Sequence, residues 1–529
     1  MFIFNENFIL ISLIIASIFI LASLFVAHQF KLFAKKAKGP LMYALPIKDN
    51  ETNIDKHIAQ LAKQTNGLGL KQDALKVLSD NIDAFSARAM TAYSAGRSLD
   101  LMYYIWQNDL TGRLLLKEVL EAANRGVRVR LLLDDMYTQG HDPALLTLDQ
   151  HPNIYIRLFN PSRARNSYIK RILEMALRAI TTTRRMHNKA FIVDGKIAFV
   201  GGRNIGNAYF DAGQKSNFRD LDLMLIGPSV KDVETIFDNF WNSDVVLPIN
   251  KLNTIKPKDS IKKWHAKLND FAKSNEAKPY ITSIHDHIKL QHLLNPQHNI
   301  FPAQKVQVLS DPPEKALGLN AENWMMKSFK PLMEGAKEKL TITSPYFVPG
   351  KAGTNLLCQH VQNKVDVRIL TNSLAATDVI AVHGGYAPYR KKLLRGGVKI
   401  FELKPNSNRP KKLHLLGSKR ASLHTKAFSI DNKIGFVGSF NFDPRSVSLN
   451  TEMGIVFMSK PIMNILDNIY SQETAEDSSY TLSLTKKHKL QWHSLINGKI
   501  VTFNHEPEPR LWRIILSKTF GWLPIQSQL

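Results

Sequence analysis

The sequence predicts an α/β protein built from two copies of one α/β unit and preceded by a membrane-spanning helix. Three observations lead to this fold class. Apolar segments with strand and helix periods alternate along the body of the chain. The same order of segments occurs twice at a nearly constant spacing. Residues 8–27 carry no charge, and a helix of that length reaches about 30 Å, the thickness of the hydrocarbon layer of a bilayer.

Residues 8–27 are interpreted as a transmembrane anchor, with a cleavable signal peptide as the alternative. A signal peptide needs a basic leader and a shorter apolar core, whereas the leader MFIFNEN carries Glu6. Four lysines follow the apolar run, namely Lys31, Lys35, Lys36 and Lys38. The positive-inside rule therefore predicts a single-pass protein whose body lies on the cytoplasmic side of the membrane.

The repeated unit is predicted from matching segments in the two halves of the chain. In the first half we expect a helix over residues 114–125 and strands over residues 99–106, 127–133 and 154–159. In the second half we expect helices over residues 354–363 and 386–394 and strands over residues 340–348, 365–370 and 398–403. The offsets are 340 − 99 = 241 and 365 − 127 = 238. Near-constant offsets indicate a duplication in which helices flank each sheet on both faces.

These segments divide the chain into five predicted parts. They are an anchor with a basic juxtamembrane segment (1–45), a first α/β unit (46–251), a linker rich in Lys, Asn and Pro (252–307), a second α/β unit (308–505) and an amphipathic tail (506–529). A length of 529 residues fits two or three domains, and an apolar fraction of 44% excludes wholesale disorder. The single cysteine, Cys358, allows no intrachain disulfide and forms no zinc pattern.

Charge and two amphipathic segments indicate anionic partners. The net charge is 70 − 45 = +25, which suits nucleic acid and anionic lipid head groups alike. Residues 160–186 combine seven basic residues with apolar residues at helical spacing. Such a helix either lies in a membrane interface or faces the core with a solvated basic side, and the spacing leaves both open. In the tail, Trp512 and Trp522 stand near Arg513 and Lys518, which favours a membrane interface.

A short motif occurs once in each half of the chain. Residues 187–194 read HNKAFIVD and residues 424–431 read HTKAFSID, so both have the form H-x-K-x4-D, and their offset is 424 − 187 = 237. Residues i and i+2 of a strand share a face, so each copy directs its histidine and its lysine to the same side. Two copies indicate a paired functional site more strongly than incidental histidines on two structural hairpins.

The sequences that flank the two motifs also match. Asn204 and Asn441 each follow their histidine by 17 residues, and Gly202 and Ser439 each follow it by 15. This extended pattern resembles the phospholipase D superfamily, whose motifs come in pairs. The resemblance implies two α/β/α sandwich domains related by a pseudo-twofold axis, with both motif strands at their interface. It implies a catalytic set of His187, Lys189, Asp194, His424, Lys426 and Asp431.

The residue types suit the cleavage of a phosphodiester. Neutral imidazole is a nucleophile near neutral pH, and Lys189 and Lys426 would offset the charge of the phosphoryl oxygens. Asn204, Asn441 and Ser439 could add neutral donors to the same oxygens. One histidine attacks, the other protonates the leaving alkoxide, and a covalent phosphohistidine results. The resemblance suggests His187 as nucleophile and His424 as acid, whereas the residues alone leave this assignment open.

Each imidazole needs an acidic partner on its other nitrogen to fix its tautomer. Glu452, 28 residues after His424, stands where the superfamily places such a carboxylate, and Asp222 is the candidate in the first half. Asp194 and Asp431 are expected to anchor the hairpin behind each motif, away from the substrate. Because Gly202 replaces Ser439, the first half is expected to lack one side-chain donor. The mechanism needs no cofactor, and no metal cluster is apparent in the sequence.

Longer stretches, over residues 125–135, 151–161 and 184–210, resemble bacterial cardiolipin synthases of the C-type branch. The resemblance implies transfer of a phosphatidyl group to phosphatidylglycerol, with phosphatidylethanolamine as donor, at the bacterial inner membrane. The alternative is a phospholipase D that hydrolyses phospholipids to phosphatidic acid. A nuclease is opposed by the transmembrane segment, so no nucleic acid partner is expected, and a non-catalytic binder is opposed by the intact motifs. The oligomeric state stays open.

Overall fold

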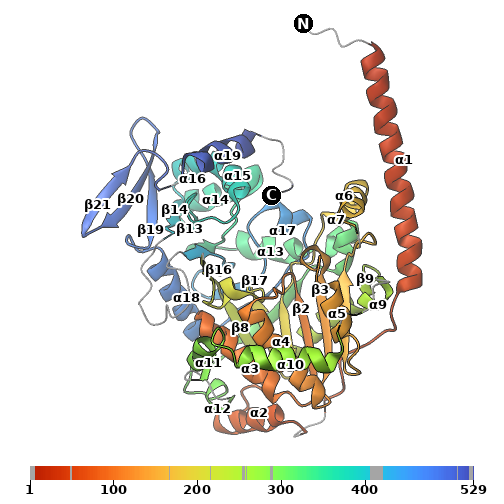
Figure 1. The fold of residues 1–529 in the computed structure, drawn as a ribbon. Helices are drawn as coiled ribbons and strands as arrows, with labels where there is room; N and C mark the ends of the chain where they lie inside the picture. The colour runs from red at the N-terminus through yellow and green to blue at the C-terminus, as the bar shows by residue number, and fades with distance from the viewer. Residues whose placement is uncertain are drawn as a thin grey trace.

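Two β-sheets covered by helices form the body of the protein, and one long helix projects away from it (Figure 1). The computed structural model describes residues 6–47, 51–165, 167–214, 216–252, 257, 259–285, 290–405, 421–508, 510–522 and 528. The predicted class, α/β with two copies of one unit, is confirmed.

The first sheet has nine strands in the order β10-β1-β8-β6-β5-β2-β3-β4-β9. Their bounds are β1 (Ala74–Leu78), β2 (Ser98–Tyr103), β3 (Arg128–Asp134), β4 (Ile154–Phe159), β5 (Ala190–Val193), β6 (Ile197–Gly201), β8 (Asp222–Ile226), β9 (Val246–Pro248) and β10 (Phe301–Pro302). Strands β2, β3 and β4 are parallel, which requires crossover helices between them. Strands β5, β6, β8 and β1 continue the sheet in antiparallel pairs.

The second sheet has ten strands in the order β11-β18-β17-β16-β12-β13-β14-β19-β20-β21. Their bounds are β11 (Gln304–Ser310), β12 (Lys339–Thr343), β13 (Asp366–Asn372), β14 (Lys399–Leu403), β16 (Ala427–Ile430), β17 (Ile434–Gly438), β18 (Met453–Met458), β19 (Ser479–Leu484), β20 (Leu490–Ile496) and β21 (Lys499–Phe503). The order β11 to β14 repeats the order β1 to β4 of the first sheet, with β16, β17 and β18 in place of β5, β6 and β8.

Helices cover both faces of each sheet. In the first half they are α2 (Asn53–Gln64), α3 (Asn81–Ser94), α4 (Leu110–Asn124), α5 (Asp142–Leu148), α6 (Tyr168–Leu177), α7 (Ala179–Thr182), α8 (Val230–Trp241) and α9 (Ile249–Leu252). In the second half they are α13 (Met325–Glu334), α14 (Gly350–Gln362), α15 (Ile380–Tyr386), α16 (Arg390–Arg395), α17 (Pro444–Ser448), α18 (Lys460–Glu473) and α19 (Leu511–Trp522). The predicted helix over residues 386–394 is found as the end of α15, a 3-10 turn over Ala387–Tyr389 and α16.

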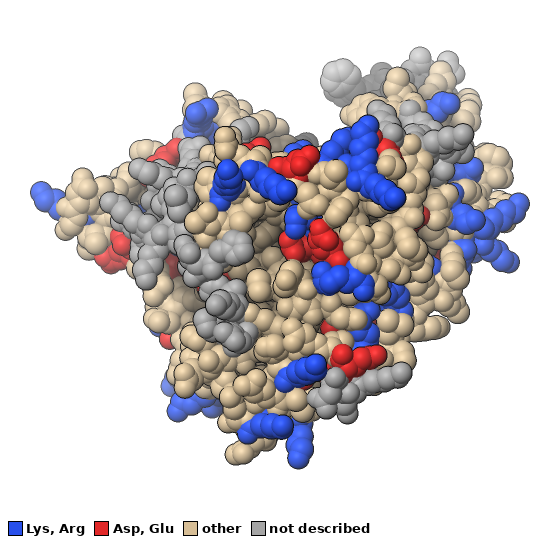
Figure 2. Space-filling model, turned by 60° about the horizontal axis from the view of Figure 1, so that its bottom comes forward, with Lys and Arg blue, Asp and Glu red and all other residues tan. Residues whose placement is uncertain are grey.

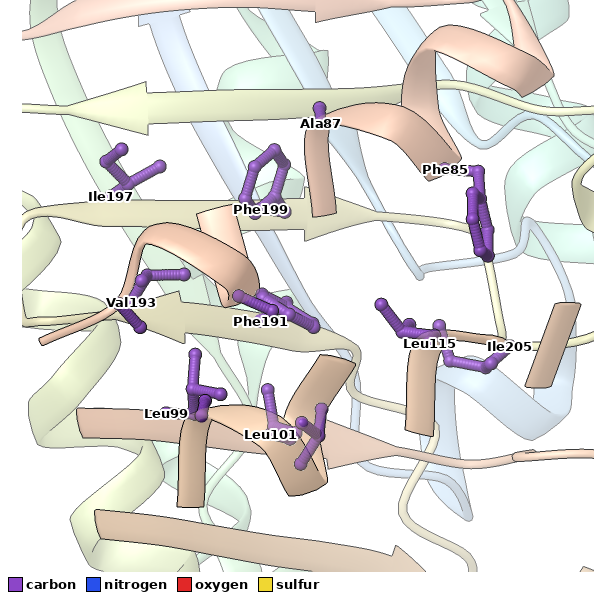
Figure 3. Packing of buried hydrophobic residues seen from close by; sticks show 14 of the residues in the cluster. Phe85, Ala87, Leu99, Leu101, Leu115, Phe191, Val193, Ile197, Phe199 and Ile205 are labelled. Atoms are coloured by element: carbon purple, nitrogen blue, oxygen red, sulfur yellow. The ribbon is translucent and has the colours of Figure 1, made fainter. Parts of the chain in front are cut away.

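The core of the first unit forms between its sheet and the helices α3 and α4. Figure 3 shows Phe191 and Phe199 of the sheet near Ala87 of α3, in one cluster with Phe85 of α3 and Leu115 of α4. A second apolar cluster contains residues of both units, among them Phe237 of α8 and side chains of β18 and α18. The two units therefore share buried apolar surface, whose removal from water opposes their separation.

The region predicted as a linker, residues 252–307, contains three further helices. These are α10 (Ile261–Ala272), α11 (Lys278–His285) and α12 (Leu290–Leu293). Leu268, Tyr280 and Leu293 are buried in the core of the first unit, and the Tyr280 hydroxyl donates to the carbonyl oxygen of Phe210 at 2.7 Å. The three helices thus pack on α3 and α4 of the first unit, whereas residues 304–307 already belong to β11 of the second sheet. The role of this region as a boundary stays a prediction.

Helix α1 (Glu6–Ala37) is the projecting helix of Figure 1. Its segment Leu10–Ala37 is long and apolar enough to cross a membrane, and its most apolar 18 residues have a mean hydropathy of 2.8. Ile15, Leu21 and Phe25 are more than 60% exposed, which is typical of a helix surrounded by lipid. The C-terminal end of α1 instead packs on the body, where Ala34 and Ala37 are buried beside β9.

The basic segment 160–186 forms α6 and α7. Its basic side chains face the body and its large apolar side chains face outward, which is the opposite of an ordinary core-facing helix. Its buried basic residues are Arg165, Arg171, Arg178 and Arg185. Its large exposed apolar residues are Tyr168, Ile169, Ile172 and Leu173. The alternative of an apolar face in the core with a solvated basic side is therefore wrong. Some of the positive charge of the chain is internal for the same reason. On the face seen in Figure 2, the exposed Lys and Arg side chains form several separate groups.

Two aspartates close the hairpins behind the motifs. Asp194 is fully buried, and its carboxylate accepts backbone N–H groups of Gly96, Arg97 and Ser98 at 2.7–3.0 Å. Asp431 accepts the corresponding groups of residues 337–339 at 2.8–3.2 Å and is partly exposed. Both have a positive φ of 53°, which aspartate and asparagine tolerate.

We predict that Asp194→Asn lowers the free energy of unfolding by about 2 kcal/mol, because a buried charged acceptor of three N–H groups is lost. Asp431→Asn should cost clearly less, because water can replace part of its contacts. Thermal unfolding of the full chain in detergent measures the difference. Equal losses at both positions would contradict the burial argument.

Candidate active site

Backbone contacts between the two halves bring the motif strands together. The residue before the first motif, Met186, forms a bridge with Thr451 of the second half. The backbone N–H of His187 donates to the Thr451 carbonyl oxygen at 2.9 Å, and the Thr451 N–H donates to the Arg185 carbonyl oxygen at 2.9 Å. The first motif is therefore fixed by the chain that leads into β18.

The second motif is in turn fixed by backbone contacts with the first half. Strand β15 (Ala421–Leu423) pairs in parallel with β7 (Asn217–Arg219) of the first half. The backbone N–H of His424 then donates to the Arg219 carbonyl oxygen at 2.7 Å. The backbone of each histidine is thus hydrogen-bonded to the other half of the chain. Neither half by itself holds a complete site.

The carboxylates that orient the two imidazoles are exchanged between the halves. Nδ1 of His187 lies 2.8 Å from Oε2 of Glu452, and Nδ1 of His424 lies 2.5 Å from Oδ2 of Asp220. All four side chains are buried. Because a carboxylate occupies each Nδ1, the Nε2 nitrogen of each ring is the one available for chemistry.

Asp222, expected to orient an imidazole, does not do so. Its carboxylate is bound by Arg88 at 2.6 Å and Arg203 at 3.3 Å, inside the first unit. Asp222 pairs with Gly201 in the sheet, as Gly454 pairs with Gly438, so Asp220 is the counterpart of Glu452. Counting from the histidine was misleading because the connection is longer in the first half (33 residues against 28). Alignment of the apolar strands that follow the carboxylates would have identified Asp220.

The difference between Gly202 and Ser439 also has a structural reason. Ser439 Oγ donates to Glu452 and accepts the Met453 N–H at 3.0 Å. Its hydroxyl therefore binds the Glu452 carboxylate and not a substrate oxygen. A Cβ atom at Gly202 would lie 2.3 Å from Oδ1 of Asp220. The glycine therefore makes room for the carboxylate that orients His424. The first half does lack this side-chain donor, but the expectation that Ser439 donates to a substrate oxygen was wrong, because its hydroxyl donates to Glu452.

The two asparagines after the motifs are not equivalent. Asn204 is occupied at both ends, since its Oδ1 accepts the Ile105 N–H at 3.1 Å and its Nδ2 donates to the Tyr209 hydroxyl at 2.9 Å. Asn441 is buried, and its Oδ1 has no hydrogen-bond partner among the described residues. Of the two amides, Asn441 is the better candidate for contact with a bound group.

Lys189 and Lys426 are buried close to each other, and neither forms an ion pair with a carboxylate in the described part of the chain. The ammonium group of each donates to the backbone carbonyl oxygen of its own histidine, at 2.7 Å for Lys189. Burial lowers the pKa of Lys189 well below its usual value, and the charge of Lys426 lowers it further. Burial lowers the pKa of Lys426 to about 8. A bound phosphodiester would supply the missing negative charge and stabilise both ammonium groups.

The two imidazoles differ in their electrostatic surroundings. Burial and the charges of both lysines lower the pKa of His187 well below its usual value. Burial and Lys426 also lower the pKa of His424, but Asp220 opposes this shift. Burial raises the pKa of Glu452 to about 7. Burial acts on Asp220 in the same sense, but His424 and Lys426 outweigh it and keep the pKa of Asp220 below its usual value. Asp220 is therefore the more firmly anionic partner.

Aromatic rings complete the walls around the two imidazoles. Tyr104 meets the His187 ring edge to face at a centroid distance of 5.2 Å. Tyr209 meets the His424 ring in the same way at 5.3 Å, and Phe218 lies 4.9 Å from it. No sequence motif identifies Tyr104, Tyr209 and Phe218 as wall residues, because their positions depend on the segments that follow β2 and β6. Among the described residues, no group of three or more His, Cys, Asp or Glu could hold a metal ion.

Comparison with known proteins agrees with this geometry. The family model described as "Cardiolipin synthase, PLD-like domain" matches residues 91–241 and 329–473, each of which contains one motif. Cardiolipin synthase C of Escherichia coli (strain K12) is 40% identical over 467 residues, which are 86% of this chain and 96% of that protein. An uncharacterized protein of Helicobacter pylori (strain J99 / ATCC 700824) is 30% identical over 489 residues, 92% of this chain and 96% of that protein.

A solved structure shares the fold. The crystal structure of phosphatidylserine synthase from Haemophilus influenzae Rd KW20 superposes with a TM-score of 0.54 at 14% identity, over 89% of this chain and 99% of that chain. The match extends over both units. The predicted resemblance to the phospholipase D superfamily is confirmed, and with α1 it indicates a membrane protein. The chain belongs to the cardiolipin synthase family of phospholipase D-like proteins.

Proposed function

We propose that this protein is a phosphatidyltransferase of the cardiolipin synthase type, which transfers a phosphatidyl group from phosphatidylethanolamine to the glycerol hydroxyl of phosphatidylglycerol. The observation that carries the proposal is the pair of buried imidazoles, each oriented by a carboxylate of the other half and placed beside a buried lysine. The similarity to cardiolipin synthase C over most of the chain supports the choice of substrates. We also propose that α1 is a single membrane anchor and that the exposed lysines at its end keep the body in the cytoplasm.

The first half-reaction cleaves the donor lipid. His187 Nε2 attacks phosphorus, an N–P bond forms, and the bond from phosphorus to the head-group oxygen breaks. His424, protonated on Nε2, gives its proton to the leaving alkoxide. Lys189 and Lys426 hold the non-bridging oxygens. The negative charge of these oxygens favours the protonated form of both lysines. The product of this step is a phosphatidyl-histidine at position 187.

The second half-reaction uses the same groups in reverse. His424, now neutral, takes the proton of the incoming glycerol hydroxyl, whose oxygen attacks phosphorus and breaks the N–P bond. Water in place of the glycerol hydroxyl would give phosphatidic acid. The difference between the two imidazoles supports these roles, since the pKa of both is lowered by burial but that of His187 is lowered further, whereas Asp220 opposes the shift at His424.

The proposed function is tested with the full chain in vesicles of phosphatidylethanolamine and phosphatidylglycerol. We expect cardiolipin as the main product. His187→Ala and His424→Ala should each abolish nearly all turnover, and the double variant should be no worse, because the two groups act as one unit. If phosphatidic acid is the main product, the protein is a hydrolase and not a transferase. A large residual activity in either single variant would refute the shared site.

A donor with a good leaving group should separate the two histidines. p-Nitrophenolate leaves without protonation, so His424→Ala should recover much of its adduct formation on a p-nitrophenyl phosphatidyl donor. His187→Ala should form no adduct on any donor. Labelled phosphohistidine, located by mass spectrometry, measures both. An adduct at position 424 in His187→Ala would reverse the assignment.

The exchanged carboxylate gives a further prediction. Asp220→Asn should lower turnover with phosphatidylethanolamine by a factor on the order of a hundred or more, because the His424 imidazolium loses its partner. The loss should shrink with the p-nitrophenyl donor, which a purely structural role of Asp220 would not produce. Asp222→Asn is the matched control, since its contacts with Arg88 and Arg203 lie within the first unit. It should reduce stability with the same relative loss on both donors.

A further inference from the structure

Helix α6 presents its apolar side chains to the outside of the protein. Tyr168, Ile169, Ile172 and Leu173, called here the α6 patch, are 67%, 77%, 49% and 58% exposed. They lie within six consecutive residues of one amphipathic helix. Large apolar side chains gathered on one exposed helix face are typical of a surface that meets another apolar phase.

The other side of α6 is attached to the body by buried charges. Arg171 pairs with Asp135 at 3.2 Å, and Arg178, which pairs with Glu174 of the same helix, also donates to the side-chain oxygen of Asn160 at 3.3 Å. Arg165, just before the helix, pairs with Asp135 and with Asp142. Ion pairs of this kind lose much of their attraction to desolvation, and apolar packing of the same helix would often be more stable. Protein stability alone therefore does not explain why the apolar face points outward.

The position of α6 relative to α1 identifies the phase that the patch meets. The guanidinium of Arg178 lies 3.4 Å from the ring centroid of Phe30, and that of Arg163 lies 4.4 Å from the ring centroid of Phe33. Phe30 follows the uncharged run 8–27 by three residues, a rise of about 4.5 Å. Figure 1 shows α6 on the side of the body that faces α1. The helix is thus attached where α1 leaves the hydrocarbon.

Basic side chains surround the patch as head groups would require. Lys170 of α6 is exposed, as are Lys31 and Lys35 on the adjacent end of α1. Lysines at this depth attract anionic head groups, while the apolar side chains between them reach the acyl boundary. The same surroundings would be unfavourable for a wholly apolar protein partner.

A short chain of contacts links α6 to the nucleophile. Arg171 of α6 holds Asp135, whose neighbour Asp134 binds Arg185 and accepts the N–H of Met186, the residue before His187. In the 3-10 turn that begins at Asp135, Tyr137 contacts Tyr104, which in turn contacts the His187 ring. These contacts therefore fix the position of His187 relative to α6.

We propose that α6 lies in the bilayer interface, with the α6 patch in the acyl boundary, and that it docks the entrance of the active site on the membrane beside α1. This rests on the proposed function only in that the substrate is a membrane lipid. The site then takes its phospholipids from the plane of the bilayer, since the docking helix and His187 share the Asp134–Asp135 anchor.

The first test measures depth and does not depend on activity. In a Cys358→Ser background of the full chain, Ile169→Cys and Leu173→Cys are labelled with an environment-sensitive fluorophore and reconstituted in vesicles of phosphatidylethanolamine and phosphatidylglycerol. Lipids with a spin label near the head of the acyl chain should quench both positions. Ile500→Cys in the hairpin β20–β21, where Ile500 is 66% exposed, is the matched control and should not be quenched. Absence of quenching at 169 and 173, with or without a protein contact there, would overturn the proposal.

The second test compares two forms of the same substrates. For Ile169→Glu/Ile172→Glu, the ratio of turnover in vesicles to turnover in detergent micelles should fall about tenfold or more relative to the wild type, because burial of two large apolar side chains is lost. The ratio for Ile496→Glu/Ile500→Glu should not change. An unchanged ratio for the α6 variant would refute the docking role. If the wild type makes no cardiolipin, the proposed function fails while the quenching result still decides the docking.

Discussion

Two carboxylate–imidazole contacts that cross between the halves are the interactions on which the site depends. Glu452 of the second half holds His187 of the first, and Asp220 of the first half holds His424 of the second. The backbone contacts at Thr451 and Arg219 place both pairs. Any opening of the interface would therefore disorient both imidazoles at once. The shared apolar cluster between the sheets makes such opening costly, because it would expose that surface to water.

The site holds two buried ammonium groups that form no direct ion pair among the described residues, so the more distant carboxylates Glu452 and Asp220 offset their charge only in part. Lys189 and Lys426 are buried, and burial shifts the pKa of each downward. An anionic phosphodiester removes this imbalance, so binding of substrate and protonation of the lysines reinforce each other. The same field keeps His187 neutral and able to attack. Charge that costs stability in the empty site thus contributes to binding and to chemistry.

Buried arginines connect this site to helix α6. Arg185 and Arg171 bind the adjacent carboxylates Asp134 and Asp135, one toward His187 and the other toward α6. Such pairs are directional, whereas apolar packing is not, so they fix the relative position of the two elements. A phosphatidyl group is anchored in the bilayer by its acyl chains. A catalytic centre that acts on it must therefore be held at the height of the head groups.

The sequence by itself determined the elements whose signal is local or repeated. The pattern H-x-K-x4-D, its matching flanks and the near-constant offsets identified the duplicated unit, both histidines and both lysines, and the resemblance to the superfamily added Glu452. Strand periodicity placed β4 at Ile154–Phe159 without error. The apolar run identified α1, because a membrane-spanning helix requires only length and hydropathy.

Only the tertiary structure decided which groups meet across the interface and which side of a helix faces outward. Asp220 and Asp222 are both acidic and two residues apart, and sheet register alone gives one to His424 and the other to Arg88. For α6, periodicity separates an apolar from a basic face, but the partners Asp135 and Asp142 turned the basic face inward. Periodicity records only how residues are spaced within an element, whereas burial depends on partners that the chain supplies from distant positions.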